Sequence, residues 1–458
     1  MRTHRKLAVA TVTALSLTGG LTAVTAGTAT AATPAGYADD FDGDGYRDYA
    51  TGGNGKVTVV YGTRTGPGPK TVRFTQDSPH IPGEAGEAGG YADRFGDQLA
   101  NADLNRDGYA DLVVGDRSEQ VGTTAGAGAV TVLWGSRAGL GAKATRLPVP
   151  AGAGLGLGAA LASGDFDGDG RADLAVADGG SVYIYRGGFS PSGTTGRVTR
   201  NTPPGTLEPA ALVAGKVDKD RATDLFVLGQ GQESGGKPTQ VYWYLHGGSA
   251  VTSGRFITHN QFLPSSHPAG VIADFDRNGY GDLAFGDIRY NKDSGSVVVI
   301  PGKAGGFGYA YMVTQSSPGV VTAASKGDGF GYSLSAGDTN RDGYPDLAVG
   351  VPGEDVGSVR DAGGVHILRG SRTGLVGTPG RAGVSQWFSR AGTGVPGNAT
   401  QDERLGLFVR LRDFDRDGDA DLLVSGDLNR RSVLLRATAS GITTSRASET
   451  GLDPDFPQ

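Results

Sequence analysis

The chain contains no cysteine, so no disulfide holds its fold together. The Gly-x-Ser-x-Gly sequence of a serine hydrolase elbow is absent as well. No cluster of Lys and Arg and no array of stacking aromatics is present, which argues against a nucleic-acid partner. After the first 32 residues, no stretch is apolar enough to cross a bilayer. These absences direct attention away from disulfide scaffolds, nucleic-acid binders and membrane spans.

The N-terminus carries the pattern of a secretory leader. Arg2, Arg5 and Lys6 form a basic start, residues 7–21 are mostly apolar, and residues 29–31 read Ala-Thr-Ala. We therefore predict a signal peptide over residues 1–32 and a single domain over residues 33–458. The mature protein is expected to be secreted into the extracellular space, where it could remain attached to the cell surface, with no transmembrane segment after cleavage.

Glycine is frequent, at 80 of 458 residues, which is typical of a chain with many tight turns. The formal net charge is -6, and about -9 once the three basic leader residues are removed. The acidic residues concentrate in short loops. About six divalent cations would reverse this charge, so we interpret the acidity as the mark of cation sites.

These loops repeat one nine-residue pattern, Asp-x-Asp-x-Asp-Gly-x-x-Asp. Complete or nearly complete copies begin at Asp40, Asp103, Asp165, Asp274, Asp338 and Asp413, and a degenerate copy begins at Lys216. Side-chain oxygens at positions one, three and five converge if the chain turns sharply, and glycine at position six permits the turn. The carbonyl of position seven and the carboxylate of position nine complete six or seven oxygen ligands, which suits Ca²⁺ better than Mg²⁺.

The predicted calcium ligands therefore follow directly from the pattern. They are Asp40, Asp42, Asp44, Tyr46 and Asp48; Asp103, Asn105, Asp107, Tyr109 and Asp111; Asp165, Asp167, Asp169, Arg171 and Asp173; Asp274, Asp276, Asn278, Tyr280 and Asp282; Asp338, Asn340, Asp342, Tyr344 and Asp346; Asp413, Asp415, Asp417, Asp419 and Asp421. Three loops contain one Asn, which coordinates without adding charge, so these loops are expected to bind more weakly than the first, third and seventh.

The loop at Lys216 lacks both the first Asp and the glycine, which is replaced by Arg221. Two readings stay open. The Lys216 ammonium takes the place of the cation and pairs with Asp218, Asp220 and Asp224, or the segment is an exposed charged turn without any replacement.

Short apolar strands surround each loop. One follows the ninth position, as in 111–115, another comes later, as in 128–135, and several loops are preceded by a third, as in 95–100. The loop starts are 63, 62, 51, 58, 64 and 75 residues apart, and each interval has room for four short strands. Units of four strands repeated at this period are typical of a β-propeller.

The Phe-Gly before the loop and the Gly-x-Val-x-Val-Leu-x-Gly after it resemble the FG-GAP repeat. That family builds the seven-bladed propellers of integrin alpha subunits and of many bacterial secreted proteins. The resemblance implies an all-β, seven-bladed β-propeller of four-stranded antiparallel blades, with calcium loops between strands one and two. Some repeats depart from the pattern, with Gly36-Tyr37-Ala38, Leu157-Gly158 and Leu405-Gly406 in place of Phe-Gly.

The resemblance also implies a ligand surface on the face opposite the calcium loops. The segments expected there are 117–126, 230–238, 288–293, 352–362, 76–92 and 391–402. Five aromatics are either ligand platforms or blade packing: Trp243, Tyr290, Tyr309, Tyr311 and Trp387.

Catalytic groups are not apparent. Outside the predicted leader there are five histidines, and their spacing is not that of metal ligands: His80, His246, His259, His267 and His366. We therefore predict a calcium-dependent extracellular binding or adhesion module for a protein, glycoprotein or polysaccharide, with no catalytic residue assigned. The alternative is a calcium-dependent extracellular hydrolase or polysaccharide lyase on the same scaffold.

Overall fold

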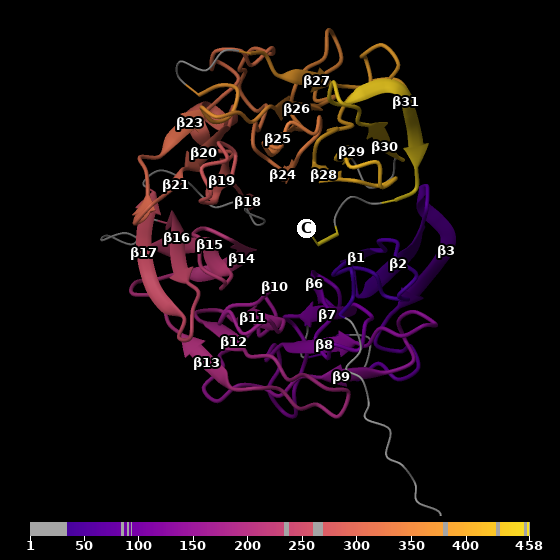
Figure 1. The fold of residues 1–458 in the computed structure, drawn as a ribbon, viewed down its shortest axis with the longest axis vertical. Helices are drawn as coiled ribbons and strands as arrows, with labels where there is room; N and C mark the ends of the chain where they lie inside the picture. Colours follow the sequence, from indigo (N-terminus) through magenta and orange to yellow (C-terminus); the bar gives the residue numbers. More distant parts are fainter. Residues whose placement is uncertain are drawn as a thin grey trace, which may run out of the picture.

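The computed structural model describes residues 34–83, 87–88, 91–92, 94–232, 238–259, 269–378, 383–426, 431–452 and 456–457. Successive antiparallel sheets are arranged in a ring around a central axis, and the C-terminus lies inside the ring (Figure 1). The architecture is an all-β seven-bladed propeller, which confirms the propeller predicted from the repeat spacing and the seven blades implied by the resemblance to the FG-GAP repeat. The predicted leader, residues 1–32, lies outside the described residues.

The first blades follow the order of the chain. Blade one contains β1 (Tyr49–Gly53), β2 (Lys56–Thr63) and β3 (Gly66–Phe74). Blade two contains β6 (Gln98–Ala102), β7 (Asp111–Asp116), β8 (Ala129–Leu133) and β9 (Ala144–Arg146). Blade three contains β10 (Ala160–Gly164), β11 (Asp173–Ala177), β12 (Val182–Tyr185) and β13 (Val198–Asn201). Blade four contains β14 (Glu208–Gly215), β15 (Asp224–Gln232), β16 (Pro238–His246) and β17 (Thr252–His259).

The remaining blades complete the ring. Blade five contains β18 (Gly270–Ala273), β19 (Asp282–Asp287), β20 (Ser296–Ile300) and β23 (Tyr311–Val313). Blade six contains β24 (Leu334–Gly337), β25 (Asp346–Val351), β26 (Gly364–Leu368) and β27 (Gln386–Phe388). Blade seven contains β28 (Phe408–Arg412), β29 (Asp421–Ser425), β30 (Ser432–Arg436) and β31 (Thr443–Thr450).

A few short elements lie outside the blades. They are the hairpins β4 (Glu87–Ala88) with β5 (Tyr91–Ala92) and β21 (Gly302–Lys303) with β22 (Gly306–Phe307), and the short α1 (Tyr290–Asp293). Blade one differs from the other six, because its sheet has three strands in the described part of the chain and lacks an innermost strand before the first acidic loop.

The antiparallel pairing defines two faces of the disc. In blade two, Ala102 at the end of β6 pairs with Asp111 at the start of β7, and Gln98 pairs with Gly115 at the other end. The acidic loop joining these strands therefore lies on one face, which we call the acidic face. The starts of the first strands and the ends of the second strands lie on the opposite face.

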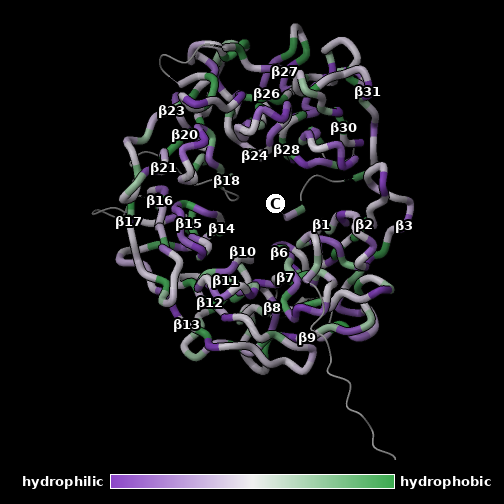
Figure 2. Tube along the Cα trace, viewed as in Figure 1, coloured by the Kyte–Doolittle hydropathy of each residue, from purple (hydrophilic) through white to green (hydrophobic). Residues whose placement is uncertain are grey.

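The core consists of layers between neighbouring blades. One cluster combines Val113 and Val132 of blade two with Leu174 and Tyr183 of blade three, and corresponding clusters occupy the other blade interfaces. The second strand of blades two, three, five, six and seven is buried along its whole length. Figure 2 accordingly shows hydrophobic segments around the whole ring. Strands buried on both faces explain the continuous apolar runs after each loop.

The glycines of the repeat permit close contact between blades. A Cβ on Gly286 at the end of strand two would lie 1.9 Å from the carbonyl oxygen of Gly331 in the next blade. The same arrangement joins Gly52 to Gly96 at 2.0 Å, Gly115 to Gly158 at 2.5 Å and Gly350 to Gly406 at 2.0 Å. These are the glycines of the Phe-Gly and Leu-Gly pairs, so the two sequence variants fill one structural role.

The ring closes between blade seven and blade one through side chains. Tyr49 stacks on Phe414 with ring centroids 5.5 Å apart, and Phe456 from the C-terminal segment packs edge-on against Tyr49 at 5.5 Å. Arg412, at the end of β28 in blade seven, forms a buried ion pair with Asp39. This pair connects the first strand of blade seven to the segment before β1. The C-terminal segment thus takes part in the interface between blades seven and one, where the two ends of the ring meet.

Candidate metal centres and the opposite face

The acidic loops are preorganised by their own backbone. In six blades the amide of the glycine at position six donates a hydrogen bond to the carboxylate at position one, as Gly170 does to Asp165 at 2.9 Å. The glycine at position six has a positive φ in each of these loops, 83° for Gly170. Position four is also left-handed, and it is an arginine in four loops: Arg106, Arg277, Arg341 and Arg416. The sequence pattern predicted the turn at position six but not the left-handed residue at position four.

Position nine has the same role in all seven blades. One carboxylate oxygen accepts a hydrogen bond from the amide of position two, and the other accepts one from an amide at or just after the end of strand three, as Asp111 does from Leu104 at 2.9 Å and from Gly135 at 2.9 Å. The corresponding acceptors are Asp48, Asp173, Asp224, Asp282, Asp346 and Asp421. Position nine therefore joins the loop to the third strand, in addition to any role as a ligand.

Burial raises the pKa of these carboxyls, because the hydration that the charged form loses is worth more than the backbone N–H hydrogen bonds that it gains. The pKa is about 8 for Asp48 and Asp111, about 7 for Asp282, and about 6 for Asp173, Asp346 and Asp421. Neighbouring carboxylates add to the shift, as Asp107 and Asp103 do at Asp111. A positive charge inside the loop would remove this cost.

The arrangement of oxygens is compatible with a hard cation. Carboxylate oxygens of positions one, three and nine lie within 4.8 Å of one another in the loops of blades one, three and five, as do those of positions one, three and five in blade seven. Buried Oδ1 atoms of Asp42 and Asp415, both at position three, have no hydrogen-bond partner. Convergent carboxylates with orphaned oxygens fit Ca²⁺, whose ligands are all oxygen.

Some predicted ligands face other partners. Asp419, at position seven of the last loop, forms an ion pair with Arg341 at 2.7 Å, so its side chain is engaged by the neighbouring blade. This is consistent with the prediction that position seven contributes its carbonyl and not its side chain.

The degenerate loop of blade four matches neither open reading. The Lys216 ammonium donates to the carbonyl of Arg221 instead of pairing with the aspartates. The basic group against those aspartates is His246, whose Nδ1 lies 2.9 Å from Asp224 and 3.6 Å from Asp218. Lys219 and Arg221, at positions four and six, do not adopt the left-handed conformation of the other loops. The contact of His246 with this loop was not predicted, because His246 is 22 residues from Asp224 and shows no spacing motif.

Burial of the candidate aromatics divides them. Trp243 is completely buried in the interface between blades three and four, which confirms the packing reading for that residue. Tyr311 packs against the interface of blades five and six, and Trp387 stacks on His366 with centroids 4.6 Å apart. Tyr309 is 96% exposed.

The opposite face carries a pocket between blades two, three and four. The volume of this pocket is about 640 Å³. Its lining comes from the predicted loop 117–126 and from segments that the sequence did not single out, including Arg94 and Asp97, Leu155 and Glu208. Arg94 and Asp97 form an ion pair at 3.0 Å, and Leu155 is 61% exposed. The pocket thus combines charged groups with an exposed apolar side chain.

Three more of the predicted loops lie between second and third strands, whereas 76–92 and 391–402 fall in the connections between blades. Segment 352–362 falls between β25 and β26, and 288–293 falls between β19 and β20. Segment 230–238 begins inside β15, and its middle, 233–237, lies outside the described residues. Glu354 in segment 352–362 turns inward and accepts a hydrogen bond from Gln315 at 2.5 Å. Burial raises the pKa of Glu354 to about 7 and that of its neighbour Asp328 to about 6.

None of the helices in the described part of the chain is both long enough and apolar enough to span a membrane.

Comparison with known proteins gives matches in the same repeats. The model of the FG-GAP-like repeat matches residues 40–114, 103–176 and 165–227, and that of the FG-GAP repeat matches residues 330–368. Human integrin alpha-6 is 32% identical over 139 residues, which cover 29% of this chain and 11% of the integrin. Rat phosphatidylinositol-glycan-specific phospholipase D is 31% identical over 158 residues, covering 33% of this chain and 17% of that protein. The chain therefore spans a small part of the curated relatives it matches.

Among solved structures, an Agrocybe aegerita lectin that recognises non-reducing terminal N-acetylglucosamine covers 90% of this chain and 92% of its own, at 15% identity and a TM-score of 0.47. At this distance the similarity carries no argument about ligands.

Proposed function

We propose that this chain, a seven-bladed β-propeller of FG-GAP repeats, is a secreted calcium-stabilised binding module. Its partner is an extracellular protein, glycoprotein or polysaccharide, and the ligand occupies the pocket of blades two to four on the opposite face. The observation that carries the proposal is this pocket of about 640 Å³. It is the size of a small-ligand or oligosaccharide site.

The division of labour between the two faces supports this assignment. The carboxylates of the acidic face are engaged in holding loops to strands, and a cation would complete that role. The pocket is built from the other ends of the strands, where the loops supply no cation ligand. Loops on a rigid scaffold are the usual place for recognition.

The lining suggests how a ligand would be held. Arg94, Asp97, Arg117 and Glu208 offer charged hydrogen-bonding groups around a space that also contains Leu155. Apolar contact with a few convergent polar groups is the common composition of a ligand site. Sugars and peptide loops both present such mixed surfaces.

The test is a binding screen on glycan and protein arrays, with hydrolysis of polysaccharides followed in parallel. For any ligand found, Leu155→Ser and Arg117→Ala should each reduce affinity by about tenfold or more, as expected for central contact residues. Val384→Ser is the matched control, because Val384 is 66% exposed and does not line the pocket.

If both pocket variants bound the ligand with unchanged affinity, the ligand would have to bind at another place on the ring. Turnover of a polysaccharide would instead favour the hydrolase or lyase alternative. Cleavage of the leader is tested separately by N-terminal sequencing of the exported protein.

A further inference from the structure

One residue at the end of strand three lies beside the acidic loop of its own blade, immediately before the amide that donates to position nine. The amide that follows this residue donates to the position-nine carboxylate, for example Gly187 to Asp173 at 2.7 Å. The side chain of the preceding residue therefore starts next to the loop. The seven residues at this position are Tyr61, Trp134, Arg186, His246, Pro301, Arg369 and Arg436.

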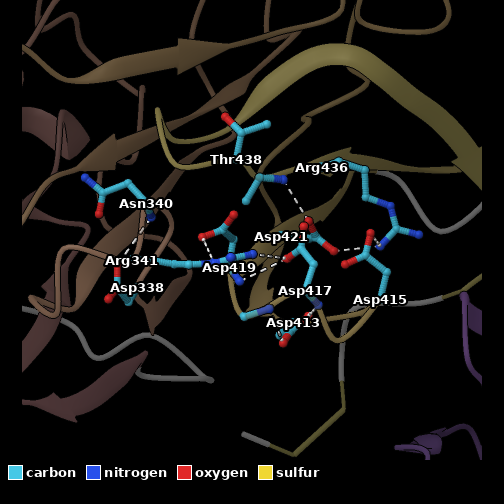
Figure 3. A network of polar contacts seen from close by, with 12 residues as sticks. Asp338, Asn340, Arg341, Asp413, Asp415, Asp417, Asp419, Asp421, Arg436 and Thr438 are labelled. Atoms are coloured by element: carbon cyan, nitrogen blue, oxygen red, sulfur yellow. Dashed lines mark hydrogen bonds and ion pairs between the residues drawn. The ribbon is translucent and has the colours of Figure 1, made fainter.

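In three blades this side chain is basic and contacts the same two carboxylates. Arg186 lies 3.2 Å from Asp167 and 3.3 Å from Asp173, which are positions three and nine of loop three. Arg436 lies 3.6 Å from Asp415 and 2.6 Å from Asp421, the same positions of loop seven (Figure 3). Both guanidinium groups are largely buried, with side chains 12% and 16% exposed.

His246 makes the corresponding contacts in blade four, with Asp218 and Asp224 at positions three and nine. Tyr244 adds a hydrogen bond from its hydroxyl to Asp224 at 2.9 Å. Here position one is Lys216, so the loop keeps three carboxylates, Asp218, Asp220 and Asp224, and the imidazole of His246 lies against two of them. Blade four therefore shows this position fully occupied by a basic side chain of the protein.

Loops three and seven hold a second arginine each. Arg171 lies 4.0 Å from Asp169 in loop three. Arg341 reaches from loop six to loop seven, 3.2 Å from Asp417, as Figure 3 shows. Loop seven has the most carboxylates and loop three has as many as loop one, and in loops three and seven these carboxylates are already paired with arginine.

The remaining blades lack this contact in the described residues. Their side chains at the position are uncharged in blades one, two and five, and Arg369 of blade six donates to the carbonyl of Ser440. In blade one, Lys70 from β3 reaches Asp42 at 3.4 Å, but this ammonium is 49% exposed and no contact between it and Asp48 at position nine is found.

We propose that Arg186 and Arg436 are internal counter-ions that lower the calcium affinity of loops three and seven, and that His246 replaces the ion in blade four. Tight calcium binding is then confined to blades one, two, five and six. Carboxylate counting places loops three and seven among the strongest sites, and the counter-ions reverse that expectation for these two loops. This inference rests on the proposed calcium binding.

The physical reason is electrostatic. A guanidinium between positions three and nine neutralises the carboxylates that the ion needs, and it repels a divalent ion at close range. The ion must displace a pair that is already desolvated. The same arginines neutralise part of the negative charge of loops three and seven when little calcium is present.

The test is calcium titration by calorimetry on the full mature chain, with thermal melting as a second readout. Wild type should bind about four ions tightly. Arg186→Met and Arg436→Met should each raise the affinity of one further site by roughly tenfold, as expected when a unit charge is removed from beside a divalent ion. Arg369→Met is the matched control and should change nothing, because Arg369 points away from its loop.

A converse variant keeps the test decisive if either methionine variant fails to fold. Pro301→Arg places the same side chain in blade five and should remove one tight ion. Six sites of equal affinity in wild type, or methionine variants that titrate like wild type, would overturn the inference. Absence of any calcium binding would instead overturn the proposed calcium stabilisation, so the two failures are distinguishable.

Discussion

At the residue scale, the position-nine aspartate has a structural role independent of any ion. Asp224 shows this best, because it is completely buried in a loop that has lost its first carboxylate. It still accepts hydrogen bonds from the amides of Val217 and Gly247 and from Tyr244. Its retention in blade four follows from these bonds.

Asp224→Ala should therefore destabilise the protein without changing the number of calcium ions bound. Three donors would lose a buried acceptor, which we expect to lower the free energy of unfolding by about 3 kcal/mol. Urea denaturation in saturating calcium measures this. Asp220→Ala is the control, since exposed Asp220 accepts one local amide, and its effect should stay below about 1 kcal/mol. Equal losses of stability in the two variants would contradict a structural role for the hydrogen bonds that Asp224 accepts.

The buried acid pair of blade six predicts a pH dependence. Burial raises the pKa of Glu354 to about 7 and of Asp328 to about 6, so the folded chain holds protons that the unfolded chain has lost above about pH 4. Stability from these groups is present at low pH and falls as pH rises through about 7. Glu354→Gln removes one of them, so its melting temperature relative to wild type should be higher at pH 8 than at pH 5.

Melting curves at both pH values in saturating calcium test this difference. Asp77→Asn is the control, because Asp77 is exposed and lies in the connection after blade one, and its difference from wild type should be the same at both pH values. A Glu354→Gln difference independent of pH would show that the pair does not titrate in this range.

At the scale of the strand, close packing between blades depends on glycine. A methyl group on Gly286 would meet the backbone of Gly331 at 1.9 Å, where no flexible side chain can yield. We expect Gly286→Ala to lower the free energy of unfolding by about 3 kcal/mol, because two blades must separate. Chemical denaturation measures the loss, and Gly180→Ala, with no atom within 4 Å of its Cβ, should be nearly neutral. A neutral Gly286→Ala would mean that the interface is loose.

At the scale of the loop, chelation should weaken every blade that binds an ion tightly. Each site at 100 times its Kd contributes about 2.7 kcal/mol to stability. We expect the melting temperature to fall by many degrees when calcium is removed, because several carboxylate clusters lose their counter-charge together. Differential scanning calorimetry with and without a chelator measures it, and a shift of a degree or less would refute a structural role for calcium. Asp107→Ala should reduce this shift, whereas Asp220→Ala should leave it unchanged.

At the scale of the whole molecule, ring closure depends on the C-terminal segment. Phe456 is 2% exposed, contacts Tyr49 and lies 4.5 Å from the guanidinium of Arg412. Because blade one lacks an innermost strand in the described residues, this contact covers part of the last interface. Phe456→Ala should lower the free energy of unfolding by about 3–5 kcal/mol.

The measurement is denaturant unfolding in saturating calcium. Tyr309→Ala is the control, as Tyr309 is 96% exposed, and it should change stability by less than about 0.5 kcal/mol. An equally small effect of Phe456→Ala would show that the ring closes without its C-terminal segment.

The repeat and the propeller fold could be predicted from the sequence, because their signals are local. The nine-residue loop and the apolar strand after it recur at a period that fits four strands, so spacing predicts a propeller, and the resemblance to the FG-GAP repeat implied seven blades. The tertiary structure decided what joins distant positions. His246 meets Asp224, Arg436 meets Asp415 and Phe456 meets Tyr49 only after strands pair and the ring closes. Neither charge counting nor periodicity encodes such contacts, since they depend on which side chain reaches a loop from a neighbouring strand or blade.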